Sequence, residues 1–139
     1  MKVDSIHNGI VIDHIAAGRG MQLYHLLNLD ELDCSVAIIK NVHSQKMGRK
    51  DIIKVDADID LDIDAIGYVD PNATVNIIRD GLLVEKRDIC LPETLTNVIR
   101  CKNPRCITTT EQELPQLFKL TDPSQQTYRC IYCESKLIR

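Results

Sequence analysis

The sequence lacks several features that common classes of protein require. It has no tryptophan and only one phenylalanine, so aromatic side chains on which nucleic-acid bases stack are scarce. Its 17 Lys and Arg residues are outnumbered by 20 Asp and Glu residues, a balance that does little to neutralise a phosphate backbone. No run of about 18 apolar residues is present, and the N-terminus shows no signal-peptide pattern. These absences predict a cytoplasmic protein that binds neither nucleic acid nor membranes.

Motifs of common catalytic sites are also missing. The sequence has no Gly-x-Gly-x-x-Gly, no P-loop, no His-Glu-x-x-His and no Gly-x-Ser-x-Gly. Asp13 and His14 are adjacent, and adjacent side chains on a strand point to opposite faces, so these two are not expected to form an acid–base couple. We therefore predict a binding module that is not an enzyme.

Four of the six cysteines form two close pairs near the C-terminus, Cys101 with Cys106 and Cys130 with Cys133. Two such pairs match the ligands of a tetrahedral zinc site. A redox dithiol at the second pair would leave the first pair unexplained, and two disulfides would need an oxidising compartment. We predict one zinc ion. Because four thiolates leave no open coordination position, its role is expected to be structural.

The hydrophobic pattern of residues 1–92 predicts alternating strands and helices. Strands are expected at about 9–15, 34–42, 50–55, 74–79 and 82–87, and helices at about 21–28 and 60–68. This order is the ferredoxin-like βαββαβ arrangement with an added strand, an α+β fold with helices on one sheet face and the other face free. The strand at 34–42 is apolar enough to be central. Residues 93–139 are expected to form a small all-β zinc domain, with the boundary near Pro92.

A series of alternating aspartates suggests a calcium loop at first sight: Asp56, Asp58, Asp60, Asp62 and Asp64. An EF-hand needs glycine at its sixth position and glutamate at its twelfth, where this chain has Leu61 and Gly67. We interpret the aspartates instead as residues that cap a helix, because the N-terminal end of a helix favours negative charge.

Asp80-Gly81 lies between two β-branched runs and predicts a β-hairpin with a two-residue type I′ turn. In the ideal register of such a hairpin, Asn76 pairs with Glu85. Asn76 and Lys86 are then expected on opposite faces of the sheet.

Several short stretches precede the cysteine pairs in a distinctive order and spacing. They are Val3-Asp-Ser-Ile6, Gly9-Ile-Val-Ile-Asp-His-Ile-Ala16, Met47-Gly-Arg-Lys-Asp-Ile-Ile-Lys54, Ala73-Thr-Val-Asn76 and Leu91-Pro-Glu93. Over almost the whole chain this series resembles the regulatory chain of aspartate carbamoyltransferase. The resemblance implies a non-catalytic subunit of pyrimidine biosynthesis, in which residues 1–92 bind nucleotide effectors of the ATP, CTP and UTP class. It also implies that residues 93–139 dock on the catalytic chain and that regulatory chains form a homodimer.

The resemblance also implies roles for individual residues. The nucleotide-binding residues are Val3, Asp4, Ser5, Ile6, Asp13, His14, Lys50, Lys54, Asn76, Ile78, Leu83 and Lys86. Lys54 and Lys86 correspond to the lysines that face triphosphate and ribose. Asn103, Arg105 and Glu134 correspond to positions at the contact with the catalytic chain. Two alternatives remain open: a zinc-ribbon module that binds nucleic acid, and a stand-alone nucleotide-binding domain.

Overall fold

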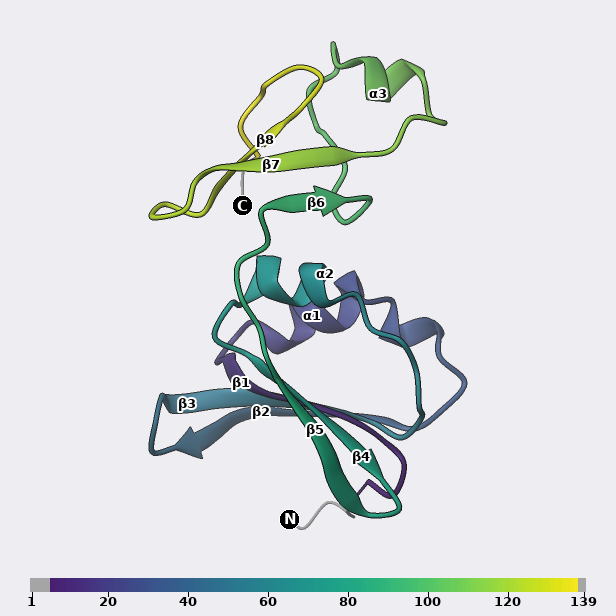
Figure 1. The fold of residues 1–139 in the computed structure, drawn as a ribbon, viewed down its shortest axis with the longest axis vertical. Helices are drawn as coiled ribbons and strands as arrows, with labels where there is room; N and C mark the ends of the chain where they lie inside the picture. The colour runs from purple at the N-terminus through teal and green to yellow at the C-terminus, as the bar shows by residue number, and fades with distance from the viewer. Residues whose placement is uncertain (1–5, 138–139) are drawn as a thin grey trace. The chain divides into compact units, whose positions relative to one another are not determined.

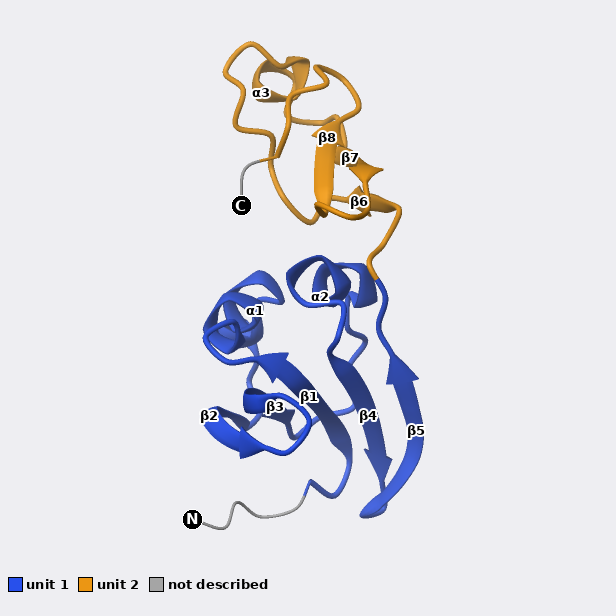
Figure 2. Ribbon diagram, turned by 90° about the vertical axis from the view of Figure 1, so that its left-hand side faces the viewer, with its two compact units in different colours: residues 1–90 blue, residues 91–139 orange. Residues whose placement is uncertain are grey.

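The computed structural model describes residues 6–137 of the chain. Contacts between residues divide the chain into two compact units, Met1–Cys90 and Leu91–Arg139, which Figure 2 draws in different colours. No helix within residues 6–137 is long and apolar enough to cross a membrane. Each unit is described below by itself.

The first unit is an antiparallel five-stranded sheet with helices on one face (Figure 1). Its strands are β1 (Gly9–Ala16), β2 (Val36–Ser44), β3 (Gly48–Val55), β4 (Thr74–Arg79) and β5 (Leu82–Asp88), in the spatial order β2-β3-β1-β4-β5. Helices α1 (Gly20–Leu26) and α2 (Ile63–Val69) connect β1 to β2 and β3 to β4, and a short 3-10 helix η1 (Leu29–Glu31) follows α1. This is the predicted ferredoxin-like order, with β5 added beside β4.

The core of the first unit lies between the helices and one face of the sheet. Alternate strand residues point into it, among them Ile12, Ile53 and Val75, which are at most 2% exposed. The predicted aspartate cap is present at the second helix. The Asp62 carboxylate accepts a hydrogen bond from the Ala65 amide at the start of α2. Asn28, with a φ of 55°, lies in the left-handed conformation between the C-cap of α1 and η1.

Two sequence predictions about elements of this unit are wrong. The second strand was expected to be central, but β2 is at an edge of the sheet, with its apolar residues only half buried. An apolar run indicates burial, and burial can come from a partner that covers an edge strand as well as from a second neighbouring strand. The second helix begins at Ile63 rather than near residue 60, so the earlier aspartates lie in the loop that precedes it.

Three strands carry an irregularity in their pairing. The register of β1 against β3 shifts between Ile12 and Ile15, and that of β2 against β3 shifts between Ile39 and Val42. His14 and Asn41, which lie inside these shifts, have φ values of 57° and 60°. The third shift lies in the β4–β5 hairpin, where Val84 is an extra residue. These bulges decide which side chains reach the open face.

The fully buried Asp51 holds the bulge of β2 and the start of α1 to β3. One carboxylate oxygen accepts hydrogen bonds from the amides of Gly18 (3.1 Å) and Gly20 (2.9 Å), and the other accepts from the Asn41 amide (2.9 Å). Gly20 is required by the close approach of this side chain, because a Cβ atom there would lie 2.8 Å from the carboxylate oxygen. Asp51 thus joins the start of α1, the bulge of β2 and strand β3.

The second unit is a three-stranded antiparallel sheet with one helical turn. Its elements are β6 (Thr94–Thr96), α3 (Ile107–Thr110), β7 (Leu117–Asp122) and β8 (Thr127–Cys130), and the sheet order is β6-β7-β8. Its core consists of few side chains, chiefly Leu95, Phe118, Tyr128 and Leu137. The Tyr128 hydroxyl donates a hydrogen bond to the carbonyl of Pro92 and so holds the first residues of the unit to the sheet.

Candidate functional site

Four cysteine side chains of the second unit meet at one point. Cys101 and Cys106 lie in the segment before α3, Cys130 ends β8 and Cys133 lies in the turn that follows. Their four sulfur atoms lie within 4.8 Å of one another, with 3.6 Å between Cys101 and Cys133 and 3.7 Å between Cys106 and Cys130. Sulfurs about 2.3 Å from a tetrahedral zinc ion are about 3.8 Å apart. The geometry therefore fits the predicted zinc site.

Hydrogen-bond donors surround the sulfurs. The Thr108 hydroxyl lies 3.1 Å from the sulfur of Cys106. Burial raises the pKa of the Cys133 thiol, but hydrogen bonds from Ser135 and Asn103 outweigh burial and lower the pKa to about 6. Burial raises the pKa of Cys101 to about 12. Metal binding at neutral pH therefore displaces protons from the cluster, and metal affinity falls as the pH is lowered.

The chemistry of this cluster is structural. Four thiolates complete a tetrahedral coordination sphere, so neither water nor substrate can reach the metal without displacing a ligand. A dithiol at Cys130 and Cys133 alone would not require the first pair to be close, yet Cys106 is as close to Cys130 as a shared ion demands. The donors from Thr108 and Ser135 are the outer hydrogen bonds that orient thiolate ligands.

The three residues expected at the contact with a partner lie around this cluster. Asn103 joins the two cysteine pairs, because its side-chain amide donates to the Ser135 hydroxyl (3.1 Å) and its side-chain oxygen accepts from the Arg105 amide (3.0 Å). Arg105 and Glu134 are exposed. Glu134 has a φ of 62°, and its amide donates to the Cys130 carbonyl (2.8 Å), which closes the turn of the second pair.

The second candidate site is the sheet face of the first unit that the helices leave open. Cross-strand partners share a face, and the registers place Lys54 opposite Val11, Val11 opposite Asn76, and Asn76 opposite Lys86. These four residues therefore form one row across β3, β1, β4 and β5, which we call the effector row. Its neighbours along each strand, such as Ile53 and Val75, point into the core.

The expected separation of Asn76 and Lys86 onto opposite faces is therefore wrong. The type I′ turn is present, with φ values of 53° at Asp80 and 75° at Gly81. The hairpin begins in the ideal register, with Ile78 opposite Leu83, and then Val84 is inserted, so that Ile77 faces Glu85 and Asn76 faces Lys86. The bulge moves Lys86 to the open face.

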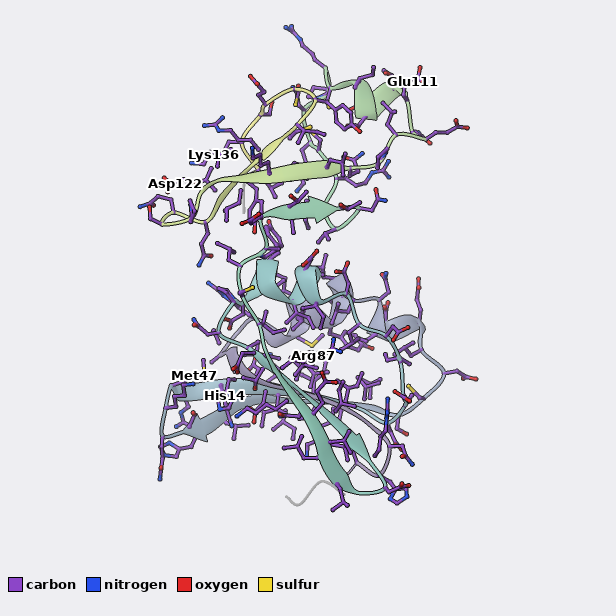
Figure 3. All side chains as sticks on the ribbon, viewed as in Figure 1. His14, Met47, Arg87, Glu111, Asp122 and Lys136 are labelled. Carbon is purple, nitrogen blue, oxygen red and sulfur yellow. The ribbon has the colours of Figure 1, made fainter. Side chains whose placement is uncertain are left out.

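The prediction that Asp13 and His14 point to opposite faces is also wrong. Asp13 forms an ion pair with Lys50 at 2.9 Å, and the His14 ring lies 3.1 Å from the hydroxyl of Thr74, two residues before Asn76 on the same face. The bulge of β1 interrupts the alternation of side chains between Ile12 and Ile15, so both residues reach the open face. Figure 3 labels His14.

The remaining nucleotide-binding residues expected from the sequence lie at the hairpin end of the open face or outside the described chain. Ile78 and Leu83 are cross-strand partners, and Leu83 is 60% exposed. Ile6, which is half buried, packs near Gly9 at the start of β1. Val3, Asp4 and Ser5 lie outside the residues that the structure describes.

Some residues of both sites were not predicted from the sequence. Val11 completes the effector row. Val11 and Asp13 are two residues apart on a strand and therefore share a face, and this spacing could have marked Val11 as part of the site. Thr108 and Ser135 each follow a ligating cysteine by two residues, a repetition that could have marked them as donors to sulfur. Asp51 has no such signal, because nothing in the local pattern shows that three distant amides converge on it.

The Asp13–Lys50 ion pair gives a test by pH. Burial alone would raise the pKa of Asp13, but Lys50 and the His14 amide lower it below its ordinary value near 3.8. The ionised carboxylate therefore stabilises the fold above that value, and the contribution is lost as the pH falls through the lowered pKa. In Lys50→Met we expect the pKa of Asp13 to rise, so the ionised carboxylate stabilises the fold less, and a smaller part of the stability is lost as the pH falls. NMR titration of the Asp13 carboxyl measures this, and Lys46→Met, a change at an exposed lysine, is the control.

Two family models together match nearly the whole chain. Residues 1–90 match the model of the aspartate carbamoyltransferase regulatory chain, allosteric domain. Residues 93–139 match the model of the aspartate carbamoyltransferase regulatory chain, metal binding domain. The two matched ranges coincide closely with the two compact units of the structure.

Relatives of similar length carry the same description. An aspartate carbamoyltransferase regulatory chain of Clostridium botulinum is 46% identical over 134 residues, which cover 96% of this chain and 92% of the relative. One from Clostridium tetani is 47% identical over 135 residues, covering 96% and 94% of the two chains. One from Bifidobacterium longum is 43% identical over 136 residues and covers 98% of both.

Proposed function

The chain belongs to the family of aspartate carbamoyltransferase regulatory chains, and from this premise we propose that residues 1–92 bind a nucleotide effector on their open sheet face while residues 93–139 dock on the catalytic chain. Regulatory chains of this family are non-catalytic subunits that control an enzyme of pyrimidine biosynthesis. The metal of the second unit is a zinc ion held by Cys101, Cys106, Cys130 and Cys133.

The effector row is the observation that carries the nucleotide proposal. Lys54 and Lys86 lie at its two ends, with Val11 and Asn76 between them. A nucleotide needs cations for its phosphates, hydrogen-bonding groups for its base and sugar, and an apolar surface for the base. The row and the neighbouring Ile78 supply all three on one face. Three strand spacings of about 4.8 Å separate the two lysine backbones by about 14 Å, so the site suits an extended ligand.

Lys50 and Asp13 extend this site. Both are mostly buried, with side chains 16% and 21% exposed, and each neutralises the other when no ligand is bound. An incoming phosphate would compete with Asp13 for the Lys50 ammonium group. Binding at this end of the face therefore requires the ion pair to be rearranged, which gives the effector a means to change the structure near the bulge of β1.

Docking on the catalytic chain is the role proposed for the zinc-bearing unit. The metal holds together a unit with few core side chains, so a rigid surface can be presented without a large hydrophobic core. Asn103, Arg105 and Glu134 are proposed to lie at that contact. Control of the catalytic chain by nucleotides requires that the effector bind two quaternary states with different affinity.

We also propose that two regulatory chains associate through their first units. Strand β2 is an edge strand that carries Val36, Ile38 and Ile39, all half buried, and an apolar edge of this kind is normally covered. A homodimer would supply that cover.

Isothermal titration of the zinc-loaded chain with ATP, CTP and UTP tests the nucleotide proposal. We expect Lys54→Ala combined with Lys86→Ala to weaken nucleotide binding at least about 100-fold, because each lysine contributes a charged hydrogen bond of about 1.5–3 kcal/mol. The double variant Lys40→Ala and Lys46→Ala, at two exposed lysines, should bind as the wild type does. The absence of binding heat with all three nucleotides in the wild-type chain would refute the proposal.

A further inference from the structure

One face of the small sheet in the second unit carries a row of three cations. The registers place Lys119 opposite Arg129 and Arg129 opposite Lys136, and Thr94 lies opposite Lys119 on the other side. We call Lys119, Arg129 and Lys136 the cation row. All three are exposed, whereas the adjacent row on the opposite face, Leu95, Phe118 and Cys130, is at most 1% exposed.

Among the described residues the cation row forms no ion pair, although the Asp122 carboxylate interacts with Lys136 over a longer distance. Within residues 6–137 no carboxylate oxygen lies within 4.0 Å of its three side-chain charges, since the ion pairs there involve other residues. The Arg129 guanidinium donates to the backbone carbonyl of Glu134 at 3.1 Å, a contact that orients it without neutralising it. Like charges directly opposite one another on neighbouring strands destabilise a sheet. Asp122 offsets part of this repulsion at Lys136, whereas the repulsion between Lys119 and Arg129 remains in the free chain.

The surface around the row is shaped and partly apolar. One depression beside it is lined by Lys119, Arg129, Ile131 and also Glu134. A second is lined by Arg129, Lys136, Gln125 and also Asp122. Ile131 is 48% exposed, so an apolar side chain lies beside the cations. Arginine is enriched at protein–protein contacts, and Ile131 supplies apolar surface beside Arg129.

We propose that the cation row is a docking surface for a carboxylate-bearing patch of the catalytic chain, an inference that rests on the docking role proposed above. Ile131 provides the apolar part of the contact, and Asp or Glu side chains of the partner lie against Lys119, Arg129 and Lys136. The partner's carboxylates offset the repulsion that the row carries in the free chain. Assembly then gains specificity and speed from charge complementarity.

The charges favour a protein partner over nucleic acid for this surface. The chain carries a net charge of −3, so a long polyanion that extends beyond the row is repelled by the rest of the molecule. Phe118 and Tyr128, the aromatic residues of this sheet, are 1% exposed and lie in the core, where they cannot stack on bases. A local cluster of carboxylates fits the row without either difficulty.

The test compares two charge-reversal variants of the full, zinc-loaded chain. Lys119→Glu combined with Lys136→Glu reverses two charges of the row and leaves Arg129 with its bond to Glu134. Lys40→Glu combined with Lys46→Glu changes the net charge equally at exposed positions of the first unit. Binding to the purified catalytic trimer from the same source is measured by sedimentation at several salt concentrations, together with zinc content and thermal stability.

We expect the Lys119/Lys136 variant to bind the trimer about 100-fold more weakly at low salt, to retain one zinc ion per chain and to unfold at an equal or higher temperature. The control variant should bind as the wild type does. If the wild type binds the trimer and the Lys119/Lys136 variant binds equally well, the cation row has no docking role. If the wild type binds single-stranded DNA in preference to the trimer, the assigned partner is wrong. If the wild type binds neither, the proposed docking function itself fails.

Discussion

Replacement of Cys106 by alanine is expected to release the metal and unfold the second unit. The Cys106 side chain is 1% exposed and its sulfur lies 3.7 Å from that of Cys130, so no other group can take its place at the ion. Structural zinc sites contribute about 10–16 kcal/mol of apparent binding free energy, and in small metal-bound domains this is the free energy that maintains the fold. Leu95, Phe118, Tyr128 and Leu137 form too small a core to replace it.

The variant is measured by metal analysis, by NMR signals of β7 and β8, and by co-elution with the catalytic trimer. We expect less than one tenth of a zinc ion per chain, loss of dispersed signals from residues 91–139, and no co-elution. Cys90→Ser is the matched control, because Cys90 is exposed and lies outside the cluster. A Cys106→Ala chain that keeps one tightly bound zinc ion and a folded second unit would show that the cluster is not the metal site.

Replacement of Asp51 by alanine is expected to lower the free energy of unfolding of the first unit by about 3–5 kcal/mol. Three amides, those of Gly18, Gly20 and Asn41, lose their acceptor, and an unsatisfied buried amide costs about 1–3 kcal/mol. The full sum is not expected, because a water molecule can enter the space left by the carboxylate and satisfy some of these groups. Such a loss is still large compared with the total stability of a typical domain.

Urea unfolding followed through amide signals of β1 and β3 measures this effect on the full chain. Asp51→Asn should destabilise less than Asp51→Ala, because one carbonyl oxygen remains to accept hydrogen bonds while the other position becomes a donor. Asp33→Ala, at an exposed aspartate, should change stability by no more than about 0.5 kcal/mol. Equal stability of Asp51→Ala and Asp33→Ala would contradict the structural role assigned to Asp51.

Much of this architecture can be predicted from the sequence because the relevant signals are local. The spacing of the four cysteines indicates a zinc site without knowledge of the fold. The five strands predicted within residues 1–92 begin and end within about two residues of the observed bounds. The Asp80-Gly81 turn and the cap at Asp62 depend on residues within one turn of the chain. These features need no information from distant segments.

The features that were predicted wrongly depend on distant contacts. At the bulge of β1, the His14 ring contacts the hydroxyl of Thr74, which is 60 residues away in the sequence. At the bulge of β2, the Asn41 amide donates to Asp51, which is 10 residues away. An alternating pattern of apolar and polar residues does not show where a residue is inserted into a strand. The predicted faces of Asp13 and His14 relative to each other, and of Lys86 relative to Asn76, were therefore wrong. The edge position of β2 likewise follows from the order of all five strands. The errors at Asp13, His14 and Lys86 concerned which face a side chain occupies, and these side chains determine the composition of the open face.

Because β5 contains the extra residue Val84, the face on which Lys86 lies depends on whether the number of residues between Asn76 and Lys86 is odd or even. Nine residues separate Asn76 from Lys86, and an odd number across a two-residue turn is possible only because Val84 is left without a cross-strand partner. Lengthening the tip by two residues preserves the orientation of the lysine, whereas adding or deleting one residue rotates it toward the helices. Change in this loop during evolution is therefore restricted to steps of two, unless a second irregularity arises to compensate.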